Sequence, residues 1–325
     1  MTLEGYRFTG SLRQFFAYLG PALIVSMAYM DPGNYGTAIQ AGALFNNGLV
    51  WSVWLASLMA MVLQYLSGKL GISTGRSLPE MIRTSLNSRY YTFTYWLAAE
   101  TAAAATDLAE YLGTVLALNL LFHIPLQDAA IFGALDVLII LVFASRKFRI
   151  IEYLFMLFVS IISIGFLYEI YVMGPNLSDV VAHTFVPSLD SSNSAFVVGI
   201  IGATVMPHAL FVHSYLAKNK LRNDTIEEKR RMRRLHLVEC VVTLTIAALV
   251  NVAILITAAK ALCPSFGCAN PPIVNINSLT VNEAAGVMGV VYGTLAGTIF
   301  AITLLSSGIA SSTTGTLAGQ AIMEG

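Results

Sequence analysis

An acid and an amide interrupt a long apolar segment near the N-terminus. Residues 15–30 (FFAYLGPALIVSMAYM) carry no charge, Asp31-Pro32-Gly33-Asn34 follows, and the apolar run then resumes. An ionised Asp at the bilayer centre costs roughly 2.5–3.5 kcal/mol on insertion scales. The proline removes a backbone donor and the glycine loosens the helix beside the acid. A membrane segment accepts this combination where it faces protein or a water-filled cavity, so the motif predicts an ion or substrate site at mid-membrane.

A second proline lies at mid-depth in the sixth apolar segment, FVVGIIGATVMPHALFVHSYLA. Pro207 is flanked there by Met206 and His208, two side chains that can contact a metal. Asp31 and Met206 are 175 residues apart, which is five predicted spans, so the two interrupted segments enter the membrane from opposite sides. Paired discontinuous helices of this kind form the binding site in transporters built from inverted repeats.

The side chains at the two helix interruptions, at Asp31–Asn34 and at Met206–His208 and called breaks from here on, suggest which ion such a site would bind. Asp31 and Asn34 supply hard oxygens, and we expect unwound backbone at Ala203 and its neighbours to supply carbonyls. Met206 supplies a thioether, which is a soft ligand. Ca²⁺ and Mg²⁺ prefer all-oxygen shells, whereas added sulfur favours Mn²⁺, Fe²⁺, Co²⁺ or Cd²⁺. The alternative for Met206 is ordinary packing, since the chain has 12 methionines.

Three acids follow one stripe of the third predicted span, YWLAAETAAAATDLAEYLG. On a helix, Glu100 and Asp107 lie within about 20° of each other, and Glu110 lies about 60° away. Acids that face the interior of a bundle form a proton relay in proton-coupled carriers, and the alternative is acids buried in hydrogen bonds or paired with a basic residue. His208, an imidazole that titrates near neutral pH, is the predicted link between Asp31 and this stripe, with a core histidine as the alternative.

Other polar residues of the spans give weaker signals. We expect a structural or gating role for His213 and packing for Cys240. Cys263 and Cys268 could form a disulfide if their loop faces an oxidising compartment. The positions at span ends, where solvation suffices and no specific role is expected, are Glu152, Glu169, Glu239, His123 and His236.

The composition indicates an all-α polytopic membrane protein. The 325 residues are 56% hydrophobic and 11% charged, against about 25% charged in soluble domains, and the mean hydropathy is +0.72. A membrane core needs about 20 apolar residues per helix. Eight segments qualify, of which the first and sixth are interrupted: 15–44, 48–72, 92–121, 127–145, 150–173, 194–217, 235–262 and 285–310.

The basic residues lie on one side of this arrangement. Of the 18 Lys and Arg, 17 fall on the side of the N-terminus, and the exception is Lys260. Positive loops mark the cytoplasmic side, which predicts a multi-pass plasma-membrane protein with a cytoplasmic N-terminus. The basic run Lys229–Arg234 is interpreted as a topology signal at a helix boundary; the alternative is anionic-lipid or nucleic-acid binding, and no nucleic-acid partner is expected.

Several stretches resemble the Nramp family of divalent-metal/proton symporters. They are DPGN in the first span, MPH in the sixth, TDLAEYLGTVLALNLLF in the third, and LAGTIFAITLLSSGIASSTTGTLAGQAIMEG at the end. The resemblance implies a LeuT-type inverted-repeat bundle and uptake of Mn²⁺ or Fe²⁺ into the cytoplasm, coupled to protons, with Co²⁺ and Cd²⁺ as further substrates. It implies metal ligation by Asp31, Asn34, Met206 and the Ala203 carbonyl, and it points to the same acids for protons.

The chain departs from the family pattern in two ways. Ala209 replaces the asparagine that usually follows MPH, a change expected to leave the ligands in place but to alter local hydrogen bonding or proton linkage. Family members have eleven or twelve spans and eight are predicted here, so we expect a fragment whose later spans are missing. Residues 1–325 are predicted to form one transmembrane transport domain, with no oligomer required.

Proteins of other classes fit the sequence less well. An intramembrane metalloenzyme is disfavoured because no HExxH motif occurs and no spacing suggests a nucleophile and base, so no enzymatic activity and no prosthetic group are expected. A carrier of the same fold for another cation or a small organic solute remains the main alternative, although Asp31 disfavours anionic substrates. A channel is the third possibility and predicts fluxes that do not saturate.

Overall fold

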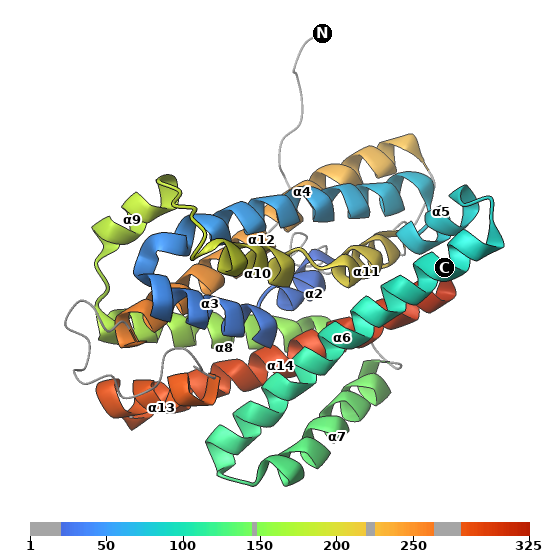
Figure 1. The fold of residues 1–325 in the computed structure, drawn as a ribbon. Helices are drawn as coiled ribbons and strands as arrows, with labels where there is room; N and C mark the ends of the chain where they lie inside the picture. Colours follow the sequence, from blue (N-terminus) through green and yellow to red (C-terminus); the bar gives the residue numbers. More distant parts are fainter. Residues whose placement is uncertain (1–20, 145–147, 219–224, 263–280) are drawn as a thin grey trace.

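The computed structural model describes residues 21–144, 148–218, 225–262 and 281–325, and the regular elements in this part of the chain are all helices, joined by short links and without a strand (Figure 1). The helices that match the predicted second to fifth spans are α4 (Val50–Thr74), α6 (Arg89–Phe122), α7 (Leu126–Ala144) and α8 (Phe148–Met173).

The first predicted span consists of two helices separated by a short non-helical link. Helix α2 (Pro21–Ala28) ends before the acid, and α3 (Pro32–Phe45) begins directly after it. The sixth predicted span is divided in the same way, into α10 (Ser194–Thr204) and α11 (Pro207–Lys218). Both interruptions coincide with the prolines that predicted them, because each proline stands at the first position of a new helix, where no backbone donor is needed.

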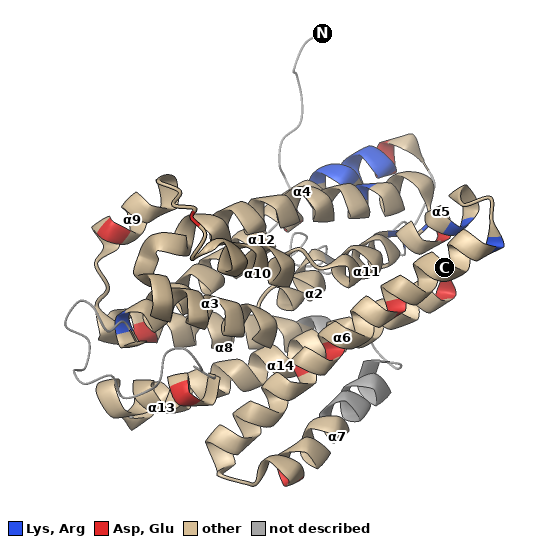
Figure 2. Cartoon of the chain, viewed as in Figure 1, with Lys and Arg blue, Asp and Glu red and all other residues tan. Residues whose placement is uncertain are grey.

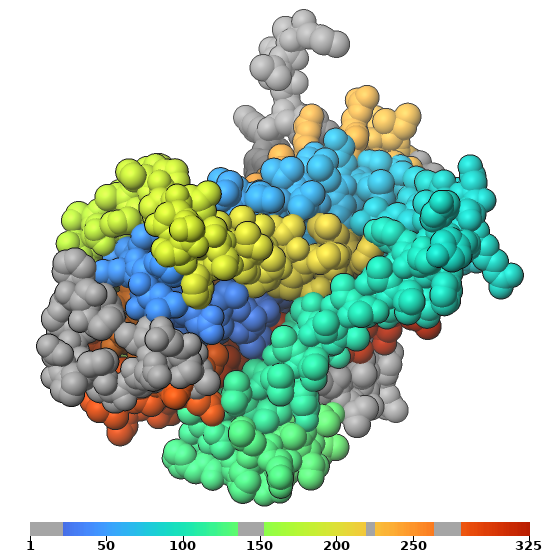
Figure 3. Space-filling view, viewed as in Figure 1, coloured from blue at the N-terminus to red at the C-terminus, as the bar shows by residue number. Residues whose placement is uncertain are grey.

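Two long helices pack against the interrupted spans. Helix α12 (Ile226–Leu262) packs against α3 and α4, and α14 (Thr294–Glu324) packs along α6. The space-filling view shows α10 and α11 between α4 on one side and α3 and α6 on the other (Figure 3). The middle of the bundle contains Tyr35, whose ring makes edge contacts with Phe166 and Phe300 at centroid distances of 5.6 and 5.9 Å.

The outer surface suits a bilayer. Six helical stretches in the described residues are long and apolar enough to cross a membrane. On α4, for example, Leu58, Val62 and Leu66 are at least half exposed. Rows of large exposed aliphatic side chains are stable in contact with lipid and unfavourable in contact with water. In Figure 2 most basic residues gather near α5 and the start of α12, apart from Lys260 in the last turn of α12, while acidic residues follow α6. The protein is therefore a multi-pass membrane protein.

The structure differs from the predicted spans in two places. The segment 285–310 is not one helix, because Gly293, with φ +95°, separates α13 (Val281–Tyr292) from α14. Glycine adopts this left-handed conformation without the steric cost of a Cβ. Helix α12 begins nine residues before the predicted start at 235, and the basic run is helical.

Two short helices and a 3₁₀ turn connect the spans: α5 (Leu78–Ser85), α9 (Leu177–Phe185) and η1 (Asn46–Leu49). They were not predicted. Cys263 and Cys268, with their possible disulfide, lie outside the described residues.

Candidate functional site

Asp31 forms the N-terminal cap of α3. Its backbone is extended (φ −78°, ψ 162°), and its carboxylate accepts hydrogen bonds from the backbone N–H groups of Gly33 (3.0 Å) and Asn34 (3.2 Å). A helix leaves its first N–H groups without partners, and an Asp at the cap position satisfies them. The same residue types that break the membrane helix therefore position the carboxylate, which is 2% exposed.

Asn34 joins the two breaks. Its Nδ2 donates to Asp31 Oδ1 (2.5 Å) and lies 3.4 Å from the carbonyl oxygen of Ala203, near the end of α10. The Thr204 hydroxyl donates to Asn34 Oδ1 (2.9 Å). The Asn34 amide is thus within hydrogen-bond reach of two of the other three predicted ligand residues, Asp31 and Ala203.

Met206 lies in the link between α10 and α11. Helix α10 ends at Thr204, and Pro207 begins α11, so Val205 and Met206 are non-helical. The Met206 side chain is 3% exposed and belongs to the main apolar core. It is therefore buried two residues from the Thr204 contact with Asn34.

Side chains of two other helices satisfy the end of α2. Asn251 of α12 donates to the carbonyl oxygen of Tyr29 (2.7 Å), and the Ser307 hydroxyl of α14 donates to that of Met30. A helix that stops inside a membrane leaves carbonyls that water cannot reach, so protein donors must replace the lost helical hydrogen bonds. Sequence reasoning missed Asn251 and Ser307, because isolated small polar residues in an apolar helix do not reveal their partners.

The acid stripe of α6 faces α14. Glu110 is fully buried, and neither of its carboxylate oxygens has a hydrogen-bond partner among the described residues. Asp107 accepts a hydrogen bond from the Ser312 hydroxyl (3.3 Å). A Cβ placed on Gly315 would lie 2.7 Å from Glu110 Oε2 and 3.2 Å from Asp107 Oδ1, so α14 has a glycine where the two acids approach it. Glu100 is partly buried further toward the start of α6.

Helix α6 also packs against the first break, between α2 and α3. A Cβ on Gly113 would lie 2.1 Å from Pro32 Cγ, so the proline ring packs directly on the α6 backbone. Gly113 is three residues after Glu110, which places the buried acid within one turn of this contact. His208, the second residue of α11, is 1% exposed, and neither ring nitrogen has a hydrogen-bond partner among the described residues. Ala209 beside it is fully buried.

Three positions expected at span ends, two of them acids for which solvation was expected to suffice, are buried. Glu169 is fully buried without a hydrogen-bond partner among the described residues. Glu239 is 6% exposed and accepts a hydrogen bond from the Ala22 N–H (3.2 Å). His236 is 3% exposed. For Glu239 and His236 the expectation was wrong because α12 begins at Ile226, which moves both residues well inside that helix.

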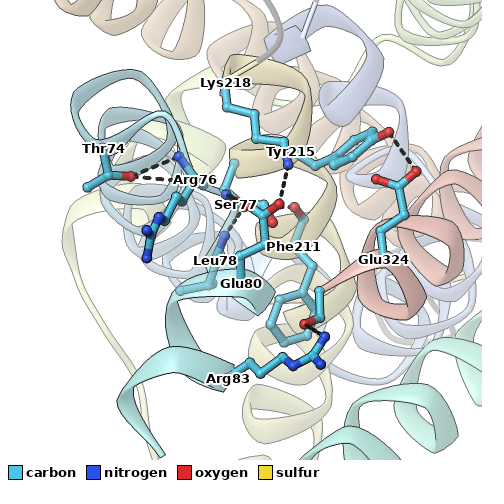
Figure 4. A network of polar contacts seen from close by, with 12 residues as sticks. Thr74, Arg76, Ser77, Leu78, Glu80, Arg83, Phe211, Tyr215, Lys218 and Glu324 are labelled. Carbon is cyan, nitrogen blue, oxygen red and sulfur yellow. Dashed lines mark hydrogen bonds and ion pairs between the residues drawn. The ribbon is translucent and has the colours of Figure 1, made fainter.

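Polar contacts connect the end of α11 to α5 and α14, as Figure 4 shows from close by. Lys218 Nζ lies 2.7 Å from Glu80 Oε1 of α5, and the Tyr215 hydroxyl donates to Glu324 of α14 (3.1 Å). The Ser77 N–H donates to Glu80 Oε2 (2.6 Å) in a capping box. Burial acts to raise the pKa of Glu80, but these hydrogen bonds and the Lys218 charge outweigh it, so the pKa lies below its ordinary value.

The fold and the two facing breaks define a class of membrane protein, the LeuT-type transporters with discontinuous first and sixth helices. Comparison with known proteins assigns the family. The model of the natural resistance-associated macrophage protein-like (Nramp) family matches residues 22–325, and the chain belongs to this family.

Individual relatives agree with the assignment. A divalent metal cation transporter MntH of Deinococcus radiodurans is 41% identical over 325 residues, covering 100% of this chain and 72% of that protein. Metal transporter Nramp3 of Oryza sativa subsp. japonica is 36% identical over 316 residues, covering 97% of this chain and 57% of the rice protein. The two names state the functions of these related proteins.

Solved structures confirm the predicted fold class. The crystal structure of an Eremococcus coleocola manganese transporter, in complex with an aromatic bis-isothiourea substituted compound, matches with a TM-score of 0.81 and 32% identity. The match covers 100% of this chain and 68% of that one.

Proposed function

We propose that the protein transports divalent transition-metal ions, Mn²⁺ and Fe²⁺ in the first place, across the plasma membrane into the cytoplasm together with protons. The observation that carries the proposal is the contact of the Asn34 amide with both the Asp31 carboxylate and the Ala203 carbonyl. This contact brings oxygens from two broken helices to one point. The names of the relatives, which are divalent metal and manganese transporters, support the same function.

The proposed ligands are the Asp31 carboxylate, the Asn34 amide oxygen, the Ala203 carbonyl and the Met206 thioether. Asp31 supplies the negative charge in a buried place, where a cation loses its water and needs compensation. A mixed oxygen and sulfur shell favours Mn²⁺, Fe²⁺, Co²⁺ and Cd²⁺ over Ca²⁺ and Mg²⁺. The ion is the substrate, and no prosthetic group is part of the proposal.

The proposed proton route consists of His208, Asp107, Glu110 and Glu100. Buried ionisable groups without ionic partners are costly in a membrane protein and are typical of proton pathways. The packing of Pro32 on Gly113 supports the route, because it places the acid helix against the metal-binding break.

The proposed orientation has the N-terminus and the basic residues in the cytoplasm. Its support is the charge distribution, since Lys and Arg of the described helices gather near α5 and the start of α12, with Lys260 in the last turn of α12 as an exception (Figure 2). The broken helices would then rock between two openings around the fixed site, as in other inverted-repeat carriers.

A Mn²⁺ uptake assay with a binding measurement tests the proposal. Asp31→Ala is expected to abolish saturable uptake into proteoliposomes and calorimetric Mn²⁺ binding in detergent. The matched control is Asp128→Ala, since Asp128 is an exposed acid in the first turn of α7. Saturable uptake by the Asp31→Ala protein at the rate of the Asp128→Ala protein would show that the site is elsewhere.

A further inference from the structure

Two histidines and a cysteine meet in the core outside the two breaks. His213 belongs to α11, and His236 and Cys240 lie one turn apart on α12. One nitrogen of each histidine and the Cys240 sulfur all lie within 4.8 Å of one another. The exposed fractions of the three residues are 0%, 3% and 0%. Three groups that can ligate a metal therefore face each other away from water.

The distances are close to those of a tetrahedral metal site. Cys240 Sγ lies 3.5 Å from His236 Nε2 and 4.0 Å from His213 Nε2, and the two rings meet edge to face at 76°. Zinc–sulfur bonds of about 2.3 Å and zinc–nitrogen bonds of about 2.0 Å place neighbouring ligand atoms roughly 3.3–3.6 Å apart. Cys240 Sγ also lies 3.7 Å from His236 Nδ1, so the sulfur is beside both ring nitrogens, and the His236 ring must turn to direct one of them at a shared ion.

The surroundings of His213 set the tautomer that a ligand needs. The Gln64 side-chain oxygen lies 2.6 Å from His213 Nδ1, and the Gln64 amide nitrogen donates to the Tyr29 hydroxyl (2.6 Å). With the amide fixed in this way, Nδ1 carries the hydrogen and Nε2, which faces Cys240, carries the lone pair. Metal-binding histidines usually donate their second N–H to an oxygen in this manner.

The ring of His236 is positioned by its neighbours. Tyr65 stacks on it at a centroid distance of 5.9 Å. A Cβ on Gly68 would lie 2.2 Å from His236 Nε2, so α4 has a glycine where the ring requires space. The helix that packs against α12 thus accommodates a large polar side chain in the core.

We propose that His213, His236 and Cys240 form a second metal site, selective for Zn²⁺ and Cd²⁺, whose occupancy slows transport. A thiolate with two imidazoles is a set that Zn²⁺ and Cd²⁺ favour and that Mn²⁺ does not. The ion would connect α11 to α12. His213 lies on α11, seven residues after Met206 in the link, which is about 10 Å of helix, so the connection restrains the half-helix that follows the transport site. The effect on transport rests on the proposed function, whereas the metal binding does not.

A binding experiment tests the site itself. The host is the full chain with Asp31→Ala and Met206→Leu, which remove the proposed transport ligands while keeping the buried volume at position 206, and with Cys263→Ser and Cys268→Ser, which remove the other thiols. Titration with Cd²⁺ is expected to give one bound ion per chain and an ultraviolet thiolate-to-cadmium absorption. Adding Cys240→Ser should abolish the absorption and weaken binding by at least ~10-fold. Adding His236→Gln instead should weaken binding similarly while the thiol is retained.

The outcomes separate the two proposals. Absence of Cd²⁺ binding in the host, or binding without the thiolate absorption, overturns the second site and leaves the proposed transport function standing. In the otherwise unmodified chain, Zn²⁺ is expected to lower the maximal rate of Mn²⁺ uptake, and added Mn²⁺ should not restore it. Cys240→Ser should remove this inhibition. Zn²⁺ inhibition that added Mn²⁺ reverses, or that persists in Cys240→Ser, overturns the regulatory role.

Discussion

The hydroxyl of Thr204 donates a 2.9 Å hydrogen bond to Asn34 Oδ1, across 170 residues of sequence. This bond turns the Asn34 amide so that its nitrogen faces the Asp31 carboxylate and the Ala203 carbonyl. A cation that takes Asn34 Oδ1 as a ligand beside Asp31 requires the amide to rotate. The Thr204 bond therefore opposes the rotation that the proposed metal binding needs.

Thr204→Val should strengthen Mn²⁺ binding. Valine has nearly the same shape and cannot donate, so the amide rotates without losing this bond. A hydrogen bond contributes about 1 kcal/mol net, which corresponds to about fivefold in the dissociation constant. Calorimetric titration with Mn²⁺ measures the change, and Thr204→Ser is the control that retains the hydroxyl. Weaker binding in Thr204→Val than in Thr204→Ser would mean that the hydroxyl supports the ligand geometry instead.

Met206→Leu should reduce discrimination against Ca²⁺. Leucine keeps the buried volume and removes the sulfur, whereas alanine at this site would add a cavity cost of about 2–5 kcal/mol. If the thioether stabilises bound Mn²⁺ by about 1.4 kcal/mol, the ratio of Mn²⁺ to Ca²⁺ affinity falls about tenfold. Competition between Ca²⁺ and Mn²⁺ in the uptake assay measures the ratio. An unchanged ratio would assign Met206 to packing.

The two breaks were predictable because their signal is local. An acid with Pro32 and Gly33, or Met206 with Pro207, is improbable inside an apolar helix unless the helix is interrupted there. The five-span separation then indicated that the breaks face each other. The acid stripe of α6 was predictable for a similar reason, since its three members share one helical face.

Other features depend on contacts that one segment of sequence does not contain. Glycines are common in membrane helices, so Gly293 did not indicate the boundary between α13 and α14. The basic run Lys229–Arg234 resembled a loop, and this hid the true start of α12. His236 and Cys240 became a cluster only through His213 of another helix.

Gly315→Ala should impair coupling to protons and lower stability. The added Cβ would lie 2.7 Å from Glu110 Oε2 and displace the acid or separate α14 from α6. Overpacking of this kind costs typically 1–3 kcal/mol. Thermal unfolding in detergent measures the stability, and a pH-sensitive dye in proteoliposomes measures proton entry during Mn²⁺ uptake.

Gly319→Ala is the matched control for that change. Gly319 lies one turn later on the same helix, and a Cβ there would meet nothing within 4 Å. Alanine is the better helix former, so this variant should gain up to about 1 kcal/mol and keep its proton entry. Equal behaviour of the two variants would refute the close approach of Glu110 to α14.

Glu80→Gln should lower the stability of the contact between α5 and the end of α11 at neutral pH and have no effect on it in acid. Glutamine can retain the capping box with Ser77 but loses the charge that faces Lys218. Because the folded-state pKa of Glu80 is lowered, its contribution is complete above the ordinary glutamate pKa of about 4.3 and disappears as the pH falls through the lowered value. A partly exposed pair contributes about 1 kcal/mol or less. The unfolding temperatures of the two proteins should therefore differ by a few degrees at about pH 7 and converge as the pH falls through the lowered pKa.

Glu227→Gln, which changes an exposed acid of α12, is the control and should follow the unmodified chain at neutral and at acidic pH. A difference in unfolding temperature between Glu80→Gln and the unmodified chain that persists in acid would show that the contact depends on shape and not on charge.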